Sequence, residues 1–116
     1  MSKFLRSFVY AFNGIIKGIA DQRNLRVLIG IAATVLAAGF YYHITALEWC
    51  IILLCIGLVI GLELINSSIE SLVDLVTLEK KPLAGKVKDM AAGAVLFASL
   101  LSSIIGLIIF GKYLIG

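Results

Sequence analysis

The sequence has 116 residues, of which 61% are hydrophobic and 15% are charged, and its mean hydropathy is +1.09. This composition leaves too little polar surface for an ordinary soluble domain, so it indicates an integral membrane protein. The formal charge of +3 is explained by basic residues beside membrane spans, and it requires no nucleic-acid partner.

The N-terminal segment, about residues 3–20, carries apolar side chains at helical spacing and polar or basic side chains on the opposite face. This pattern predicts an amphipathic surface helix lying in the membrane interface, and a helix packed against the protein's own bundle is an equally good interpretation. A polar segment, ADQRNLR at residues 20–26, follows it.

Three apolar stretches follow, at about residues 25–42, 46–76 and 88–114. A membrane-spanning helix needs about 20 residues, so each stretch is close to or beyond that length, and the far end of the second must leave the hydrocarbon. The connection at residues 78–89 contains Pro82, Gly85 and several lysines, which predicts a basic loop. The predicted fold is all-α and integral to the membrane, with three transmembrane helices plus the N-terminal surface helix.

Basic residues concentrate in the N-terminal segment and in residues 78–89, whereas the turn at residues 42–48 has none. The positive-inside rule therefore predicts a cytoplasmic N-terminus and an external C-terminus. This orientation puts the polar segment at 20–26 and the basic connection on the same side of the membrane.

The second apolar stretch also contains a polar stripe. Its members are Glu63, Asn66, Glu70 and Asp74. Spacings of three, four and four residues place them on one helical face. Ionisable groups at membrane depth indicate a functional site. Carboxylates can hold Mg²⁺ and nearby lysines can neutralise phosphate oxygens, so the pattern favours nucleotide chemistry without a P-loop, since no GxxxxGK[ST] motif is present.

Other interpretations of the stripe stay open. It could be a polar seam that fixes helix register in an oligomer. It could also be the carboxylate-lined path of a small oligomeric transporter or channel, although such a path should lie near the bilayer midplane and these carboxylates cluster at one edge. A purely structural membrane protein would leave the stripe unexplained.

Two motifs, ELINSSIESLVD at residues 63–74 and PLAGKVKDMAAGAVL at 82–96, resemble the signature of the small prokaryotic diacylglycerol kinase family, which includes the undecaprenol kinases. The resemblance extends over essentially the whole chain. It implies a homotrimer with active sites shared between subunits, transferring the γ-phosphate of ATP, with Mg²⁺, to a membrane lipid alcohol. It further implies the bacterial inner membrane, with the active site on the cytoplasmic side. The acceptor, diacylglycerol or undecaprenol, stays open.

The resemblance also implies residue roles. Glu63 resembles the catalytic base, Asn66 a polar partner beside it and Glu70 a metal ligand, while Asp74 fits the motif without a defined role. The residues that it places at the nucleotide are Tyr10, Glu70, Glu79, Lys80, Lys81, Lys88 and Asp89.

One position departs from the family pattern. Where the family has a glutamate that serves as a second metal ligand, this chain has Gln22. An amide oxygen coordinates Mg²⁺ without supplying negative charge. Three explanations stay open: Asp21 substitutes, the enzyme works with Gln22, or the chain is a catalytically impaired family member.

Overall fold

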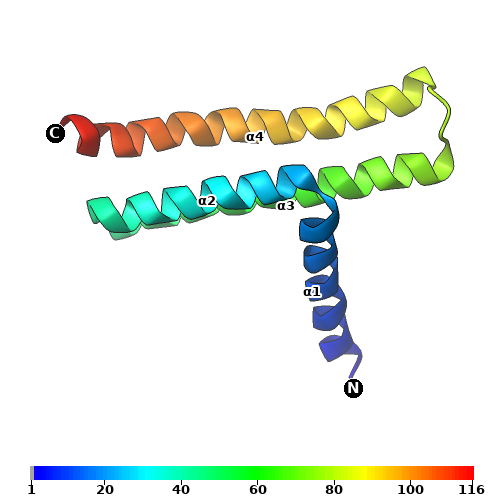
Figure 1. Ribbon diagram of the computed structural model, residues 1–116, viewed down its shortest axis with the longest axis horizontal. Coiled ribbons are helices and arrows are strands. Elements are labelled where there is room, and N and C mark those ends of the chain that lie inside the picture. The colour runs from blue at the N-terminus through cyan, green and yellow to red at the C-terminus, as the bar shows by residue number, and fades with distance from the viewer. Residues whose placement is uncertain (1) are drawn as a thin grey trace.

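The computed structural model describes residues 2–116, and within that range it contains four helices and no strand. They are α1 (Lys3–Asp21), α2 (Arg23–Tyr42), α3 (Ala46–Val76) and α4 (Pro82–Ile115). Helices α2 and α4 both run alongside α3, whereas α1 leaves the bundle crosswise (Figure 1). The all-α fold that the sequence predicted is confirmed.

A single extended residue, Gln22, separates α1 from α2, with φ −111° and ψ 111°. The Arg26 side chain closes this junction, because its Nη1 atom donates to the carbonyl oxygens of Ile19 and Ala20 at 2.8 Å each. These carbonyls belong to the last turn of α1, where helical partners are missing. The break is therefore narrower than the polar segment at 20–26 suggested, and α2 begins at Arg23 rather than near residue 25.

The turn between α2 and α3 is tight. His43 adopts the left-handed conformation, with φ 51° and ψ 54°. Gly39 packs under the indole of Trp49, and a Cβ atom at position 39 would lie only 2.6 Å from Trp49 Cη2. Only glycine fits this close approach. Thr45 then begins α3 through a capping box with Glu48.

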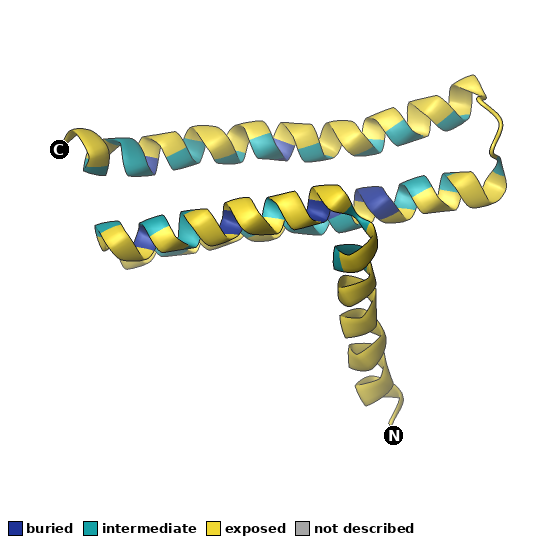
Figure 2. Cartoon of the chain, viewed as in Figure 1, coloured by how far each residue is buried: buried dark blue, intermediate teal, exposed yellow. Residues whose placement is uncertain are grey.

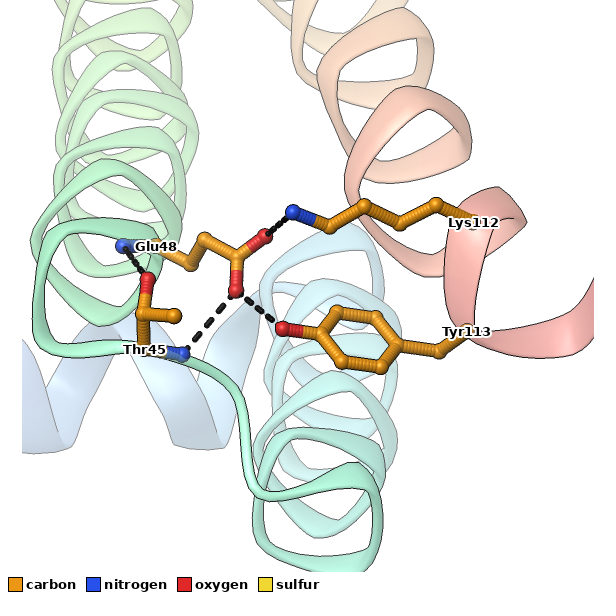
Figure 3. A network of polar contacts seen from close by, with 4 residues as sticks. All are labelled: Thr45, Glu48, Lys112 and Tyr113. Atoms are coloured by element: carbon orange, nitrogen blue, oxygen red, sulfur yellow. Dashed lines mark hydrogen bonds and ion pairs between the residues drawn. The ribbon is translucent and has the colours of Figure 1, made fainter. Parts of the chain in front are cut away.

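The buried Glu48 carboxylate also joins α3 to α4 at this end of the bundle (Figure 3). Lys112 Nζ lies 2.5 Å from its Oε2 atom. The Tyr113 hydroxyl and the Thr45 backbone N–H donate to its Oε1 atom. We call Thr45, Glu48, Lys112 and Tyr113 the far-end clasp, because it lies at the opposite end of α3 from the polar stripe.

Helix α4 begins earlier than the sequence analysis expected. Residues 78–89 were predicted to form a loop, but the connection covers only residues 77–81 and Pro82 opens the helix. Proline suits the first turn, since its fixed φ matches a helix and the N–H that it lacks would have no helical acceptor there. Lys88 and Asp89 therefore lie on α4 and not in a loop.

The bundle buries few side chains. An apolar cluster of Ile44, Ile52 and Ile109 lies beside the far-end clasp. Large apolar side chains stay exposed along α2, α3 and α4, and Figure 2 shows much of these helices coloured as exposed. These three helices are each long and apolar enough to cross a membrane. The exposed apolar surface fits lipid contact, and the chain is a multi-pass membrane protein.

Helices α3 and α4 are longer than the bilayer requires. They contain 31 and 34 residues, which corresponds to about 46 and 51 Å against a hydrocarbon thickness of about 30 Å. Amphipathic α1 meets α3 at Leu64, whose Cδ2 atom lies 2.9 Å from the position of a Cβ built on Gly18. The 12 residues from Leu64 to the end of α3 at Val76 extend about 18 Å past this contact.

Candidate active site

The polar stripe follows one face of α3, from the level of α1 toward the α3–α4 connection. Glu63 and Asn66 are 3% and 5% exposed, Glu70 is half-buried and Asp74 is exposed. Burial therefore decreases along the stripe in the direction in which α3 passes beyond α1. The predicted stripe has one covered end and one open end.

At the covered end, Ser67 is hydrogen-bonded to Glu63. Its Oγ atom lies 3.5 Å from Glu63 Oε1, and Ser67 is itself only 9% exposed. This serine is not among the site residues predicted from the sequence. Its spacing of four residues from Glu63 was the available signal, because that spacing places two side chains side by side on a helix.

Asn66 and Glu70 form a second pair one turn apart. The Asn66 Nδ2 atom donates to Glu70 Oε1 at 3.4 Å. Asn66 Oδ1 is buried and has no hydrogen-bond partner in the part of the chain that the structure describes. A buried acceptor left unpaired is unfavourable. Asn66 Oδ1 is thus a position where a donor or cation from outside this chain would complete the site.

At the open end, α3 and α4 are joined by an ion pair. Lys88 Nζ lies 2.6 Å from Asp74 Oδ1, and the two side chains are 38% and 51% exposed. Lys88 is therefore a structural partner of Asp74, and the sequence alone did not predict this pair. Asp89 follows Lys88 on α4 and is exposed.

The α3–α4 connection forms a pocket of about 520 Å³, which Lys88 and Asp74 line together with three charged residues of the connection. These are Glu79, Lys80 and Lys81. Lys81 Nζ lies 3.7 Å from Glu79 Oε2, and both side chains are well exposed. The pocket therefore presents three lysine side chains to water, which suits phosphate oxygens.

Two predicted site residues lie elsewhere in the chain. Tyr10 is 68% exposed on α1, and it lies eight residues, or about 12 Å, before the Gly18 contact with α3. Gln22 is at the α1–α2 junction. Among residues 2–116 no three Asp, Glu, His or Cys side chains gather closely enough to hold a metal ion. Neither Tyr10 nor Gln22 lines the pocket at the α3–α4 connection.

The chain is similar to known proteins of one family. Residues 9–110 match the family described as prokaryotic diacylglycerol kinase. The chain is 44% identical over 110 residues to an undecaprenol kinase of Bacillus subtilis, covering 95% of this chain and 89% of that protein. It is 39% identical over 103 residues to a diacylglycerol kinase of Synechocystis, and this match covers 88% of this chain and 59% of that protein. It is 33% identical over 113 residues to a diacylglycerol kinase of Helicobacter pylori strain J99, and this match covers 97% of this chain and 85% of that protein. All three relatives have kinase names, which favours a kinase over a transporter or channel.

Proposed function

This chain belongs to the prokaryotic diacylglycerol kinase family and is a lipid kinase, and on that premise we propose that it transfers the γ-phosphate of ATP to the hydroxyl of a membrane lipid alcohol at the polar stripe of α3. The observation that carries the proposal is the buried Glu63 carboxylate, one residue from the contact between α1 and α3. A lipid hydroxyl at the membrane interface would reach this level while its tail stays in the hydrocarbon.

In the proposed reaction Glu63 is the general base and accepts the proton of the lipid hydroxyl. The lipid oxygen forms a bond to the γ-phosphorus while the bond from that phosphorus to the β,γ-bridging oxygen breaks. ADP leaves with the electron pair of the broken bond, and the products are a lipid phosphate and ADP. The proton on Glu63 then passes to solvent.

The nucleotide phosphates would bind at the open end of the stripe. Lys80, Lys81 and Lys88 surround the pocket at the α3–α4 connection, and a lysine ammonium neutralises phosphate oxygens as a point charge. Glu79 and Asp89 lie close to these lysines in sequence. We assign Tyr10 to the same nucleotide site in the assembled protein.

A bound Mg²⁺ ion would neutralise charge on the β- and γ-phosphates. Glu70 is the ligand that we propose for it, with Gln22 at the position of the family's second acidic ligand. The donors are oxygen atoms, which Mg²⁺ prefers, and the ion commonly completes its shell with phosphate oxygens and water. A site with few protein ligands therefore fits this chain.

The active site is proposed to be shared between the subunits of a homotrimer. Tyr10 and Gln22 lie apart from the pocket of their own chain, and a second copy can bring these residues to it. The site is proposed to face the cytoplasm from the bacterial inner membrane, because the basic residues of the N-terminal segment and of residues 78–89 lie toward that end of the bundle.

Undecaprenol is the acceptor that we favour over diacylglycerol. The relative named undecaprenol kinase is 44% identical and is matched over 89% of its length, whereas the diacylglycerol kinases of Synechocystis and Helicobacter pylori are 39% and 33% identical. The test is phosphate transfer from Mg·ATP to each lipid in mixed micelles. Phosphorylation of diacylglycerol in preference to undecaprenol would reverse the assignment.

The base is tested in the same assay with Glu63→Gln, which should lower turnover by about 10²–10⁴-fold. Glu48→Gln is the matched control, because it removes a buried carboxylate from the other end of the same helix. Under conditions in which this variant is folded, its turnover should match that of the unaltered chain. Gln22→Glu tests the family's acidic ligand. If only Gln22→Glu is active, the native chain is an impaired family member; if none is active, the proposed function is wrong.

A further inference from the structure

Ser67 directs its hydroxyl group differently from the other helical serine and threonine side chains that form hydrogen bonds in the described chain. Four such hydroxyls donate to the backbone carbonyl four residues earlier, at 2.8–3.1 Å, and they belong to Ser7, Thr34, Ser68 and Ser103. This local bond is the usual outlet for a helical hydroxyl. The Ser67 Oγ atom instead lies 3.5 Å from the Glu63 Oε1 atom, a longer contact than these four.

The contact between Ser67 and Glu63 is important because both side chains are buried. Ser67 and Glu63 are 9% and 3% exposed, so water does not easily replace a missing donor at either side chain. The neighbouring Ser68 is exposed and is bonded to the Leu64 carbonyl at 2.9 Å. The two adjacent serines have the same hydroxyl chemistry but lie about 100° apart on the helix, and only Ser67 lies four residues from Glu63 and contacts its carboxylate.

We infer that Ser67 is a positioning residue for Glu63 and holds its carboxylate in the orientation needed for proton abstraction. This inference rests on the proposed function. Ser67 contacts Oε1, and in the proposed geometry Oε2 receives the proton of the lipid hydroxyl. Ser67 itself gains and loses no proton in the reaction, and the bonds to phosphorus form and break as described above.

A carboxylate with one fixed oxygen has fewer orientations to sample. Correct placement of a base matters because proton transfer requires hydrogen-bond distance between donor and acceptor in the reactive complex. Asn66 donates to Glu70. Glu63 and Glu70 therefore each contact a neutral side chain four residues away on α3.

The experiment compares Ser67→Ala, Ser67→Thr and Ser68→Ala with the unaltered chain in the Mg·ATP assay on the phosphorylated lipid. Ser67→Ala should lower kcat about tenfold, the effect of losing one hydrogen bond to a charged group, with KM for ATP unchanged. Ser67→Thr keeps a hydroxyl and should recover most of the lost turnover. Ser68→Ala should behave like the unaltered chain.

Thermal unfolding of each variant in the same micelles separates positioning from folding. The inference is overturned if Ser67→Ala keeps full kcat, if Ser67→Thr is as slow as Ser67→Ala, or if the loss of kcat is matched by unfolding at the assay temperature. In those cases the proposed function stands, provided that the unaltered chain is active and Glu63→Gln is not. Inactivity of the unaltered chain and of Gln22→Glu would instead overturn the proposed function.

Discussion

The Lys88 ammonium group lies 2.6 Å from the Asp74 carboxylate, and this ion pair joins α3 to α4 close to the connection between them. Both side chains are more than one third exposed, so the pair contributes about 1 kcal/mol or less to folding. We expect its main effect on binding rather than on stability, since it fixes a lysine that lines the pocket at the α3–α4 connection.

Asp74→Asn should therefore raise KM for ATP several-fold while changing the unfolding free energy by about 1 kcal/mol or less. Without the carboxylate, Lys88 loses the partner that orients it toward the pocket. Steady-state kinetics with varied ATP and thermal unfolding measure the two effects. Asp74→Glu, which keeps the charge, is the control; a large loss of stability with an unchanged KM would contradict this role.

In contrast to Asp74→Asn, substitutions in the far-end clasp should lower the stability of the protein and have little effect on catalysis. Lys112→Met should destabilise the protein more than Glu48→Gln, because it leaves the buried Glu48 carboxylate without its cation. Tyr113→Phe should have the smallest effect, since Lys112 and Thr45 remain as partners. Unfolding temperatures in detergent give the order, and kcat below the transition should match that of the unaltered chain.

Equal unfolding temperatures for the three clasp variants would show that the clasp does not hold α4 to α3. A compensating pair gives a second test of the same contact. Exchanging the two charges, with Glu48→Lys and Lys112→Glu together, should recover part of the stability lost in Lys112→Met. The recovery should be incomplete, because an ammonium group at position 48 cannot accept the hydrogen bonds that the Thr45 N–H and the Tyr113 hydroxyl donate to the native carboxylate.

Gly39→Ala should destabilise the turn between α2 and α3 by about 1–3 kcal/mol, because the added methyl group would overlap the Trp49 ring. Gly30→Ala is a matched control on the same helix, since nothing lies within 4 Å of a Cβ at position 30. It should be neutral or stabilising by up to about 1 kcal/mol. Fluorescence of Trp49, the single tryptophan, reports the unfolding of both variants.

Arg26→Met should loosen the junction between α1 and α2, since the Ile19 and Ala20 carbonyls lose their side-chain donor. Hydrogen exchange of the backbone amides around Gln22 should become faster, while exchange in the centre of α3 stays unchanged. Arg23→Met removes an exposed neighbouring arginine and serves as the control. Equal exchange rates in both variants would mean that Arg26 does not stabilise the junction.

The features predicted correctly from the sequence depend on periodicity. Spacing alone placed Glu63, Asn66, Glu70 and Asp74 on one face of α3, and the structure has them there. The predicted loop at 78–89 was wrong for residues 82–89, because Pro82 was interpreted as a sign of a loop although proline suits a first helical turn. The position of a proline within a helix decides its effect.

Other features depend on side-chain conformation and on contacts between distant segments. The choice of Ser67 between a backbone carbonyl and the Glu63 carboxylate is such a feature, and so is the reach of Lys112 to Glu48 across 64 residues of sequence. Helical spacing brings Ser67 close to Glu63 but does not decide which acceptor its hydroxyl contacts, and it gives no information about the pair of Lys112 and Glu48. In the proposed homotrimer, the positions of Tyr10 and Gln22 relative to the nucleotide would depend on contacts between copies of the chain.

The excess length of α3 over the bilayer has a consequence for how the two substrates meet. In the proposed orientation, a water-soluble nucleotide and a lipid with its tail in hydrocarbon approach the same helix from different solvents. Each substrate would contact the part of α3 that lies in its own medium, Glu63 for the lipid and the turns up to Val76 for the nucleotide. Neither substrate has to be transferred out of its solvent, because the helix itself crosses the boundary between them.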